Sequence, residues 1–260
     1  PDYFVLDVPR DTETNVSWLS ARARQAFLEY TPLRQQPEAP QRIHRRFPYG
    51  PGLEVFMLDM RSFRGRNDGN RQQDGATLLG RQQIDWLIDS LKRSTATWKI
   101  IASDMPIGLV VTDGDDFEAV ANGEPGQPLG REQEIARLLE AIRDHDVHNV
   151  VWLTADVHYT AAHHYAPERA AFKNFRPFWE FVSGPLHAGT FGPNDLDATF
   201  GPEVVFQKAP PDGQANLPPS AGYQFFGQVD LDGESEILTV TLKDAAGNAL
   251  HKQELTPERS

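Results

Sequence analysis

The chain alternates between short apolar runs and longer amphipathic stretches. Residues 53–59, LEVFMLD, are an apolar run that ends in Asp59, and they predict a buried strand. Residues 98–108, WKIIASDMPIG, predict a second strand that ends in Asp104. Between them, residues 78–94 place apolar side chains at the i, i+3, i+4 and i+7 spacing of an amphipathic helix, namely Ile84, Leu87, Ile88 and Leu91.

The same alternation continues downstream. Residues 131–145 repeat the helical stripe with Ile135, Leu138, Leu139 and Ile142. They lead into NVVWLTAD, residues 149–156, a third strand with Asp156 at its end, and FWEFVSGP, residues 178–185, predicts another. Strands that alternate with helices predict right-handed crossovers and a covered, largely parallel sheet.

Three of the predicted strands end in an aspartate: Asp59, Asp104 and Asp156. Ligands of parallel sheets bind just beyond the carboxyl ends of the strands, so we expect these carboxylates to lie at the binding edge. Each aspartate taken singly is equally compatible with a side chain that caps a following turn.

The C-terminal part has a different pattern. Residues 184–222 are rich in Gly and Pro and contain TFGPND and then TFGPEV, which predicts an ordered loop with similar turns. From residue 223 to residue 255 polar and apolar positions alternate with period two, interrupted by DLDGES and DAAGN. This pattern predicts an antiparallel meander or a pair of hairpins. We therefore expect a layered α/β domain with a β-rich C-terminal sheet.

Composition narrows the class of protein. The 260 residues are 39% hydrophobic and 24% charged, as in a globular domain, and no apolar run approaches the roughly 18 residues of a membrane span. The net charge of −12 argues against binding to nucleic acid or an anionic membrane, but not against an anionic substrate held by a metal ion. Cysteine is absent, which excludes thiolate ligands and a cysteine nucleophile. Because the chain starts at Pro1 without a visible secretion signal, we expect a processed or excised chain.

The best local candidate for chemistry is the D-x-H of TADVHY, Asp156 and His158. If the strand geometry continues, both side chains point to one side, about 6–7 Å apart, and reach one metal ion or two adjacent ones. The alternative, favoured for the motif alone, is an aspartate that caps a turn beside a partly exposed histidine. His163 and His164 are adjacent and face different directions, so at most one lines the same site.

For three other candidate site residues, a functional and a structural interpretation are about equally supported. His187 lies in a Gly-rich loop, either as a functional group or as a surface residue. Arg61 and Arg64 follow a strand end, where they either clamp a phosphate or hold neighbouring acidic loops together. The acidic loop 112–118, TDGDDFE, lacks the spacing of an EF-hand and is interpreted as solvated. The remaining histidines are predicted to be surface residues: His44, His145, His148 and His251.

Several motif classes are absent. The chain has no G-x-S-x-G nucleophile elbow, no P-loop and no G-x-G-x-x-G, which disfavours serine hydrolases, nucleoside-triphosphate enzymes and Rossmann dehydrogenases. A metal-assisted hydrolase remains, although two metal ions need more ligands than the candidates supply.

A set of motifs in order along residues 21–205 resembles the C-terminal half of the alkaline phosphatase D (PhoD-like) family of metallophosphoesterases. The motifs are ARARQAFLEYTPLR, RIHRRFPYGPGLEVFMLDMRSFRGRN, LLGRQQIDWLIDSLKRSTATWKIIASDMPIG, VVWLTADVHYTAAHHY and FWEFVSGPLHAGTFGP. The resemblance implies a four-layer α/β/β/α sandwich of two mixed sheets and hydrolysis of phosphomonoesters or phosphodiesters. It also implies a binuclear metal centre, of Fe and Ca with Zn, Mn or Mg as alternatives, and export to the periplasm or the medium.

Carried onto this chain, the resemblance makes Asp156 and His158 metal ligands or immediate site residues, and Arg61 a phosphate-proximal or structural residue. Asp104 is a further candidate ligand. The family's early D-x-x-D-type ligands and W-D-D-H-x-x-x-N-N motif would lie before residue 1. Residues 1–260 therefore resemble the C-terminal portion of the domain, and a missing N-terminal segment is an expected partner.

The mechanism that this resemblance implies is attack on phosphorus by a metal-activated hydroxide. A histidine (His158, His163 or His187) protonates the leaving oxygen, and Arg61 orients a small phosphate-ester substrate. Two alternatives stay open: a phosphodiesterase or phospholipase-like relative, and a catalytically incomplete structural or interaction fragment.

Overall fold

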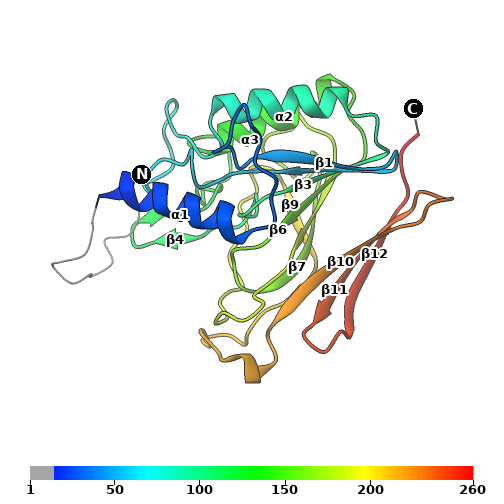
Figure 1. The fold of residues 1–260 in the computed structure, drawn as a ribbon. Helices are drawn as coiled ribbons and strands as arrows, with labels where there is room; N and C mark the ends of the chain where they lie inside the picture. The colour runs from blue at the N-terminus through cyan, green and yellow to red at the C-terminus, as the bar shows by residue number, and fades with distance from the viewer. Residues whose placement is uncertain (1–14, 260) are drawn as a thin grey trace.

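The computed structural model describes residues 15–259 (Figure 1). It contains the α-helices α1 (Val16–Tyr30), α2 (Arg81–Arg93) and α3 (Glu132–Asp144) and the 3₁₀ helix η1 (Pro219–Ala221). The strands are β1 (Arg45–Tyr49), β2 (Leu53–Met57), β3 (Trp98–Ala102), β4 (Thr112–Asp113), β5 (Asp116–Phe117), β6 (Val150–Thr154), β7 (Thr160–Tyr165), β8 (Phe178–Val182), β9 (Pro202–Lys208), β10 (Phe225–Leu231), β11 (Leu238–Asp244) and β12 (Ala249–Leu255).

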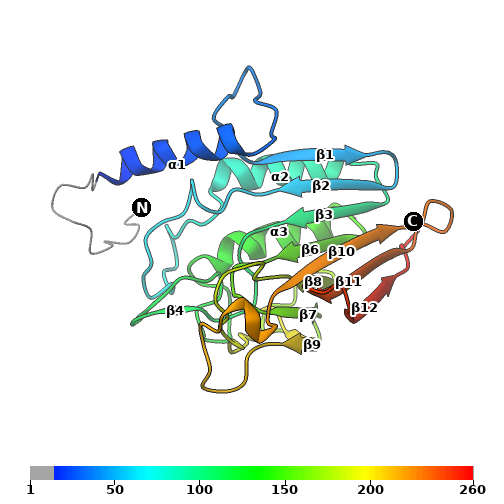
Figure 2. The same ribbon diagram turned by 60° about the horizontal axis from the view of Figure 1, so that its bottom comes forward.

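A seven-stranded sheet forms the centre, in the order β1-β2-β3-β6-β8-β7-β9. Strands β2, β3, β6 and β8 run parallel to one another. Strand β1 pairs antiparallel to β2, and β7 pairs antiparallel to β8 and to β9. The predicted strands, α2 and α3 are all present. Three of the six strand pairings are parallel and three are antiparallel, so the sheet is mixed and not largely parallel as predicted. The carboxyl ends of the parallel strands β2, β3 and β6 meet at one edge (Figure 2).

The two amphipathic helices cover one face of this sheet because their apolar stripes need a partner surface. Ile84 and Leu87 of α2 and Leu138 of α3 are almost fully buried. They belong to one core with side chains of three neighbouring strands, Phe56, Ile101 and Trp152. The helical periodicity read from the sequence thus identifies the face that packs on the sheet.

The opposite face is covered by the three-stranded antiparallel sheet β10-β11-β12, which confirms the predicted meander (Figure 1). Leu238, Val240 and Leu242 of β11 pack against Trp98, Val151 and Phe181 of the large sheet. Within residues 15–259 the layers are therefore helices, large sheet and small sheet. A fourth layer, on the outer face of the small sheet, is not among the described elements.

Two elements depart from the sequence expectation. Residues 184–222 were expected to form a loop throughout, but β9 lies inside this stretch and forms the edge of the large sheet beside β7. The strand β7 itself follows the D-x-H motif after a tight turn instead of extending β6. Both strands are specified by pairing with distant neighbours, which a local pattern does not report.

The first helix is held differently from α2 and α3. Asn15 caps α1 by accepting a hydrogen bond from the backbone N–H of Trp18, 3.2 Å long. None of the fifteen residues of α1 is buried, and Arg24 joins it to Ser62 through a 3.2 Å hydrogen bond. No helix in the described part of the chain is long and apolar enough to cross a membrane.

Candidate active site

The loop after β2 starts with a carboxylate that shapes the turn. One oxygen of Asp59 accepts hydrogen bonds from the backbone N–H groups of Arg61, at 3.1 Å, and Ser62, at 2.8 Å. The side chain of Gln83 on α2 fixes the same residue by bonding to both its N–H and its carbonyl oxygen. Asp59 is therefore a turn cap, the alternative that the sequence left open, and the turn it caps presents Arg61.

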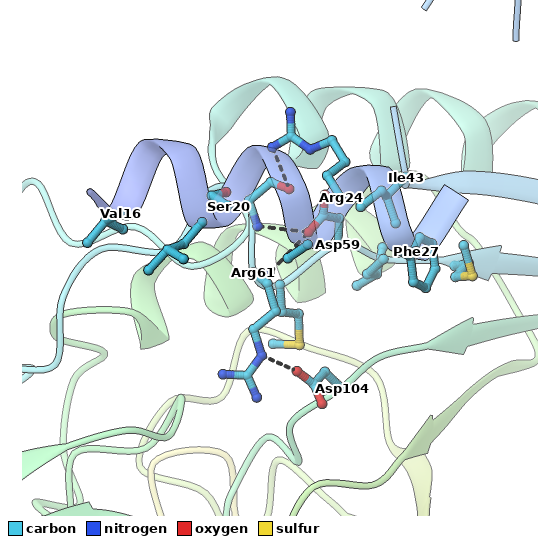
Figure 3. A pocket seen from close by; sticks show the side chains of 14 residues that line it. Val16, Ser20, Arg24, Phe27, Ile43, Asp59, Arg61 and Asp104 are labelled. Atoms are coloured by element: carbon cyan, nitrogen blue, oxygen red, sulfur yellow. Dashed lines mark hydrogen bonds and ion pairs between the residues drawn. The ribbon is translucent and has the colours of Figure 1, made fainter. Parts of the chain in front are cut away.

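The guanidinium of Arg61 is surrounded by three carboxylates. Its Nε lies 2.7 Å from Oδ2 of Asp104, and its two terminal nitrogens lie 3.3 Å from Oε1 of Glu118 and 3.2 Å from Oδ1 of Asp156. Figure 3 shows the pair of Arg61 and Asp104. Two of the three strand-end aspartates thus meet at the predicted edge. They are joined by Arg61, which lies in the loop after β2, just beyond the third aspartate, Asp59.

The electrostatics of this cluster favour a permanently charged arginine. Burial raises the pKa of the Asp156 carboxyl, the neighbouring charge of Asp104 raises it further, and Arg61 opposes both effects. For Arg61, burial acts to lower the pKa, but the carboxylates of Asp104, Asp156 and Glu118 outweigh it and raise the pKa. The side chain of Arg61 is still 42% exposed, so its charge faces solvent as well as the carboxylates.

Arg64 lies deeper and has a structural role. Its side chain is only 3% exposed, and it donates to the backbone carbonyl of Glu118 at 2.8 Å and to Sδ of Met105 at 3.4 Å. It holds the loops after β3 and β5 together. Of the two arginines proposed as phosphate clamps, Arg61 is the one whose charge reaches the surface.

The D-x-H motif forms a turn, so the expectation that it continues the strand is wrong. Strand β6 ends at Thr154, and both Asp156 and His158 adopt left-handed backbone conformations, with φ of 65° and 62°. Val157 between them is buried beside Leu109 and Tyr159 and anchors the turn. Left-handed conformations are uncommon for residues with a Cβ, and two within three residues are typical of functional sites.

His158 is oriented by the loop after β8. Its Nδ1 lies 2.6 Å from the backbone carbonyl oxygen of Gly189, and its ring centroid lies 5.2 Å from that of Phe191. A carbonyl oxygen only accepts, so the proton of the neutral imidazole resides on Nδ1. The opposite nitrogen, Nε2, is then left with its lone pair for a proton or a metal ion.

The other histidines lie elsewhere. His187 is exposed on the same loop as Gly189. His163 is fully buried on β7 with Glu180, and His164 on the opposite face of the strand contacts Arg169 and the ring of Trp179. The prediction that His163 and His164 face different directions is confirmed. His44 was expected at the surface but is only 5% exposed, because its ring packs on those of Phe63 and Trp86.

Glu118 is the site residue that the sequence did not single out. It lies at the end of the acidic loop 112–118, which was interpreted as solvated, and its side chain is 23% exposed. The rest of that loop forms the small hairpin of β4 and β5. Nothing in the local sequence distinguishes Glu118 from the three aspartates before it, since its partner Arg61 is 57 residues away.

An apolar cavity of about 580 Å³ adjoins Arg61 and Asp104. It lies between α1 and the end of β2, with Val16 and Phe27 from the helix and Ile43 among its lining residues (Figure 3). Its size is within the usual range of small-molecule sites. The charged cluster thus has an apolar surface on one side.

The described residues do not form a complete metal centre. Within residues 15–259, no group of three or more His, Cys, Asp or Glu side chains is arranged to hold a metal ion. Asp104 and Asp156 face a guanidinium instead. The donor atoms that suit a metal are the Nε2 of His158 and the carboxylate of Asp156, which is fewer than the three or four protein ligands of a typical site.

Residues 5–242 of the chain match the sequence profile of the PhoD-like phosphatase family. The chain belongs to this family. Its sequence is 32% identical over 188 residues to alkaline phosphatase D of Bacillus subtilis (strain 168), covering 66% of this chain and 31% of that protein.

One solved structure agrees at the level of the fold. The structure of PhoD matches with a TM-score of 0.53 and 19% identity, covering 97% of this chain and 52% of the other. GAP50, described as the anchor in the inner membrane complex of Plasmodium, matches with a TM-score of 0.44 and 11% identity over 84% of this chain and 54% of the other. This PhoD-like chain therefore spans about a third of the length of the Bacillus subtilis protein and about half of that of the solved PhoD chain.

Proposed function

We propose that this PhoD-like chain takes part in the hydrolysis of phosphate esters at the edge formed by β2, β3 and β6. The observation that carries the proposal is the position of Arg61. Its guanidinium is charged and is fixed by carboxylates on three sides, and the Arg61 side chain is still 42% exposed beside the D-x-H turn. A guanidinium held in this way binds a phosphate with little loss of side-chain freedom.

The neighbouring residues take complementary roles in this proposal. Arg61 orients the phosphate. Nε2 of His158 takes up a proton from solvent while Gly189 holds the other ring proton on Nδ1, and the resulting imidazolium gives the Nε2 proton to the leaving oxygen. His187, exposed on the same loop as Gly189, is the second candidate, and it takes over the proton transfer when Nε2 of His158 binds an ion. The adjoining cavity accommodates an apolar part of the alcohol.

Metal dependence is part of the proposal. Asp156 and His158 are the residues of this chain that would hold an ion, and Asp104 is a further candidate whose Oδ2 bonds Arg61. A binuclear centre, of Fe and Ca or of Zn, Mn or Mg, supplies charge neutralisation and a lowered pKa of bound water when present. The remaining ligands would come from residues outside 15–259. By family likeness we also propose a periplasmic or secreted location.

The test uses the protein with 4-nitrophenyl phosphate as the monoester and bis(4-nitrophenyl) phosphate as the diester, together with metal analysis. We expect Arg61→Ala, Asp156→Ala and His158→Ala to lower kcat/KM by at least about tenfold, and the last two to lower metal content. His164→Ala is the matched control, because this histidine lies on β7 with Arg169 and Trp179.

The outcomes separate the alternatives. Unchanged turnover and metal content in the Asp156 and His158 variants would contradict the proposal. A preference for the diester would assign a phosphodiesterase or phospholipase-like activity. A folded, monodisperse, metal-free and inactive wild-type protein would identify a structural or interaction fragment.

A further inference from the structure

A carboxylate lies in the middle of the helix-facing core. Glu180 of β8 has no exposed surface and accepts three hydrogen bonds. The donors are the backbone N–H of Ile107 at 2.8 Å, the hydroxyl of Tyr165 at 2.7 Å and the Nδ1 of His163 at 3.2 Å. Core positions of a sheet under two helices are normally apolar, so a buried carboxylate with three donors needs an explanation.

The loop after β3 is the element that these side chains hold. The backbone N–H of Ile107 ends on Glu180, and that of the next residue, Gly108, ends on the hydroxyl oxygen of Tyr165 at 2.9 Å. Two successive amides of one loop are therefore fixed by side chains of β8 and β7. The ring of Tyr165 is itself held by stacking on Phe178, with centroids 4.5 Å apart.

The loop fits closely against these strands. A Cβ added to Gly108 would lie 2.9 Å from the ring of Pro202 and 3.0 Å from the hydroxyl of Tyr165, so the backbone approaches as near as a glycine allows. Further along, the backbone N–H of Val110 donates to the carbonyl of Asp195 at 2.9 Å. Close packing and these hydrogen bonds therefore fix the position of the loop after β3 relative to the sheet.

The same loop carries a residue of the candidate site. It leaves β3 through Asp104, three residues before Ile107, and Asp104 bonds Arg61 at 2.7 Å. The backbone carbonyl of Asp104 also accepts the N–H of Ala155 at 2.9 Å, next to Asp156. A shift of the loop would therefore move a carboxylate that fixes Arg61 and the turn that carries Asp156.

We propose that Glu180 and Tyr165 are positioning residues of the site: through the amides of Ile107 and Gly108 they hold Asp104 where it fixes the guanidinium of Arg61. The Glu180–Tyr165 pair touches neither Arg61 nor Asp156 through any described hydrogen bond, and it acts through the loop. The effect of Glu180 and Tyr165 on turnover rests on the proposed function. Their effect on the position of Arg61 does not depend on that function.

The experiment compares Tyr165→Phe, which removes the hydroxyl and keeps the ring, with wild type by NMR. We expect the amides of Ile107 and Gly108 to exchange with solvent at least about tenfold faster. The Nε–H of Arg61, which Asp104 holds, should also exchange at least about fivefold faster. Glu180→Gln, which keeps one acceptor oxygen, should give an intermediate result, and Glu180→Ala the largest.

Trp98→Phe is the matched control. Trp98 is buried, and its indole N–H donates to the carbonyl of Glu236 at 2.7 Å, at the opposite end of β3. The variant loses one hydrogen bond of a buried side chain and shrinks a buried ring, whereas Tyr165→Phe loses the two hydrogen bonds of its hydroxyl; Trp98→Phe does not touch the loop. We expect it to leave the exchange of the Arg61 Nε–H within about twofold of wild type.

Activity supplies the second readout. Tyr165→Phe should lower kcat/KM about tenfold in the wild-type background and less than about twofold in an Asp104→Asn background, because both changes release the same contact. The proposal is overturned if Tyr165→Phe leaves the Arg61 Nε–H exchange unchanged, or changes it no more than Trp98→Phe. If wild type hydrolyses neither ester, the proposed function fails, while the exchange data still decide this inference.

Discussion

Arg61 and Asp104 lie 43 residues apart in the sequence, and their side chains are joined by a 2.7 Å hydrogen bond. The bond links the turn after β2 to the loop after β3, and the other end of the same guanidinium reaches Asp156 after β6. One cation thus ties together three chain segments that the parallel strands bring to a common edge.

Removing this cation should make stability depend on pH. In Arg61→Ala the ionised carboxylates of Asp104, Glu118 and Asp156 repel one another, and the pKa of Asp156, already raised by burial, rises further because Arg61 no longer opposes that effect. The repulsion costs stability while these groups are ionised and disappears once they are protonated. We expect a loss of about 1–2 kcal/mol at pH 7 that shrinks as the pH falls towards 4, measured by urea unfolding.

The control for that measurement is Arg137→Ala, which breaks an exposed ion pair with Asp85 between α3 and α2. It should change the free energy of unfolding by less than about 0.5–1 kcal/mol at every pH. An Arg61→Ala deficit that is equally large at pH 4 and pH 7 would show that repulsion among the carboxylates is not its cause.

Glu132 should produce a second pH effect of known sign. It is the first residue of α3, almost fully buried, and burial raises the pKa of its carboxyl to about 8. Between the ordinary pKa and 8 the folded state binds more protons than the unfolded state, so stability falls as the pH rises through this window. We expect Glu132→Gln to flatten this slope and to be more stable than wild type above pH 8, by a few kcal/mol at about 1.4 kcal/mol per pKa unit.

Thermal unfolding between pH 5 and pH 9 tests this expectation. Glu124→Gln is a suitable control, because Glu124 is exposed and pairs with Arg71 at the surface. If Glu132→Gln and wild type keep parallel pH profiles, Glu132 is ionised at neutral pH in the folded protein and the expectation is wrong.

Glu134 should be important for the start of α2. Its carboxylate accepts the backbone N–H groups of Leu78, Leu79 and Gly80 at 2.8, 2.7 and 3.1 Å, where α2 has no side-chain cap of its own. Glu134→Ala leaves these donors unsatisfied, and we expect a loss of about 2–3 kcal/mol in urea unfolding. Glu140→Ala on the same helix should cost less than about 1 kcal/mol, and an equal cost for both would contradict the capping role.

Gly201 should tolerate no side chain. Its φ is 61°, and a Cβ there would lie 2.5 Å from the backbone nitrogen of Ala170. Gly201→Ala should therefore cost at least about 2 kcal/mol and raise the exposure of β9, measurable by unfolding and limited proteolysis. At Gly233 a Cβ meets no atom within 4 Å, so Gly233→Ala should be nearly neutral. Similar stability of the two variants would show that the segment around Gly201 adapts.

Much of the fold was predictable because a buried face makes apolar residues recur at regular spacing along a helix or strand. The stripes of α2 and α3 and the apolar runs of β2, β3 and β6 each reflect a face that packs on a neighbour. The meander of β10–β12 was predictable for the same reason. Strand β9 was not, since its pairing with β7 comes from residues that lie about forty positions earlier in the sequence.

The site was predictable only in part. Aspartates at strand ends placed Asp104 and Asp156 at one edge. Arg61 was expected either to clamp a phosphate or to hold neighbouring acidic loops together, but no local signal shows that it lies between these two aspartates. The turn at Asp156 and His158 escaped prediction because its geometry depends on the packing of Val157 and on the carbonyl of Gly189, 31 residues from His158. Glu118 was not predicted either, because its partner Arg61 lies 57 residues away and the neighbouring residues of its loop are also acidic.

The hairpin of β7 and β8 separates His158 from the connection between the two strands. Thr160, just after the D-x-H turn, bonds Val182 at the site end, whereas Tyr165 pairs with Phe178 at the other end of the strands. The connection 166–177 leaves from that far end, about 17 Å along β7 from the turn. Ala170, Phe172 and Phe175 of this connection are buried in the main core. A substitution that loosens them would therefore open the hairpin at the end away from the imidazole and its carbonyl partner.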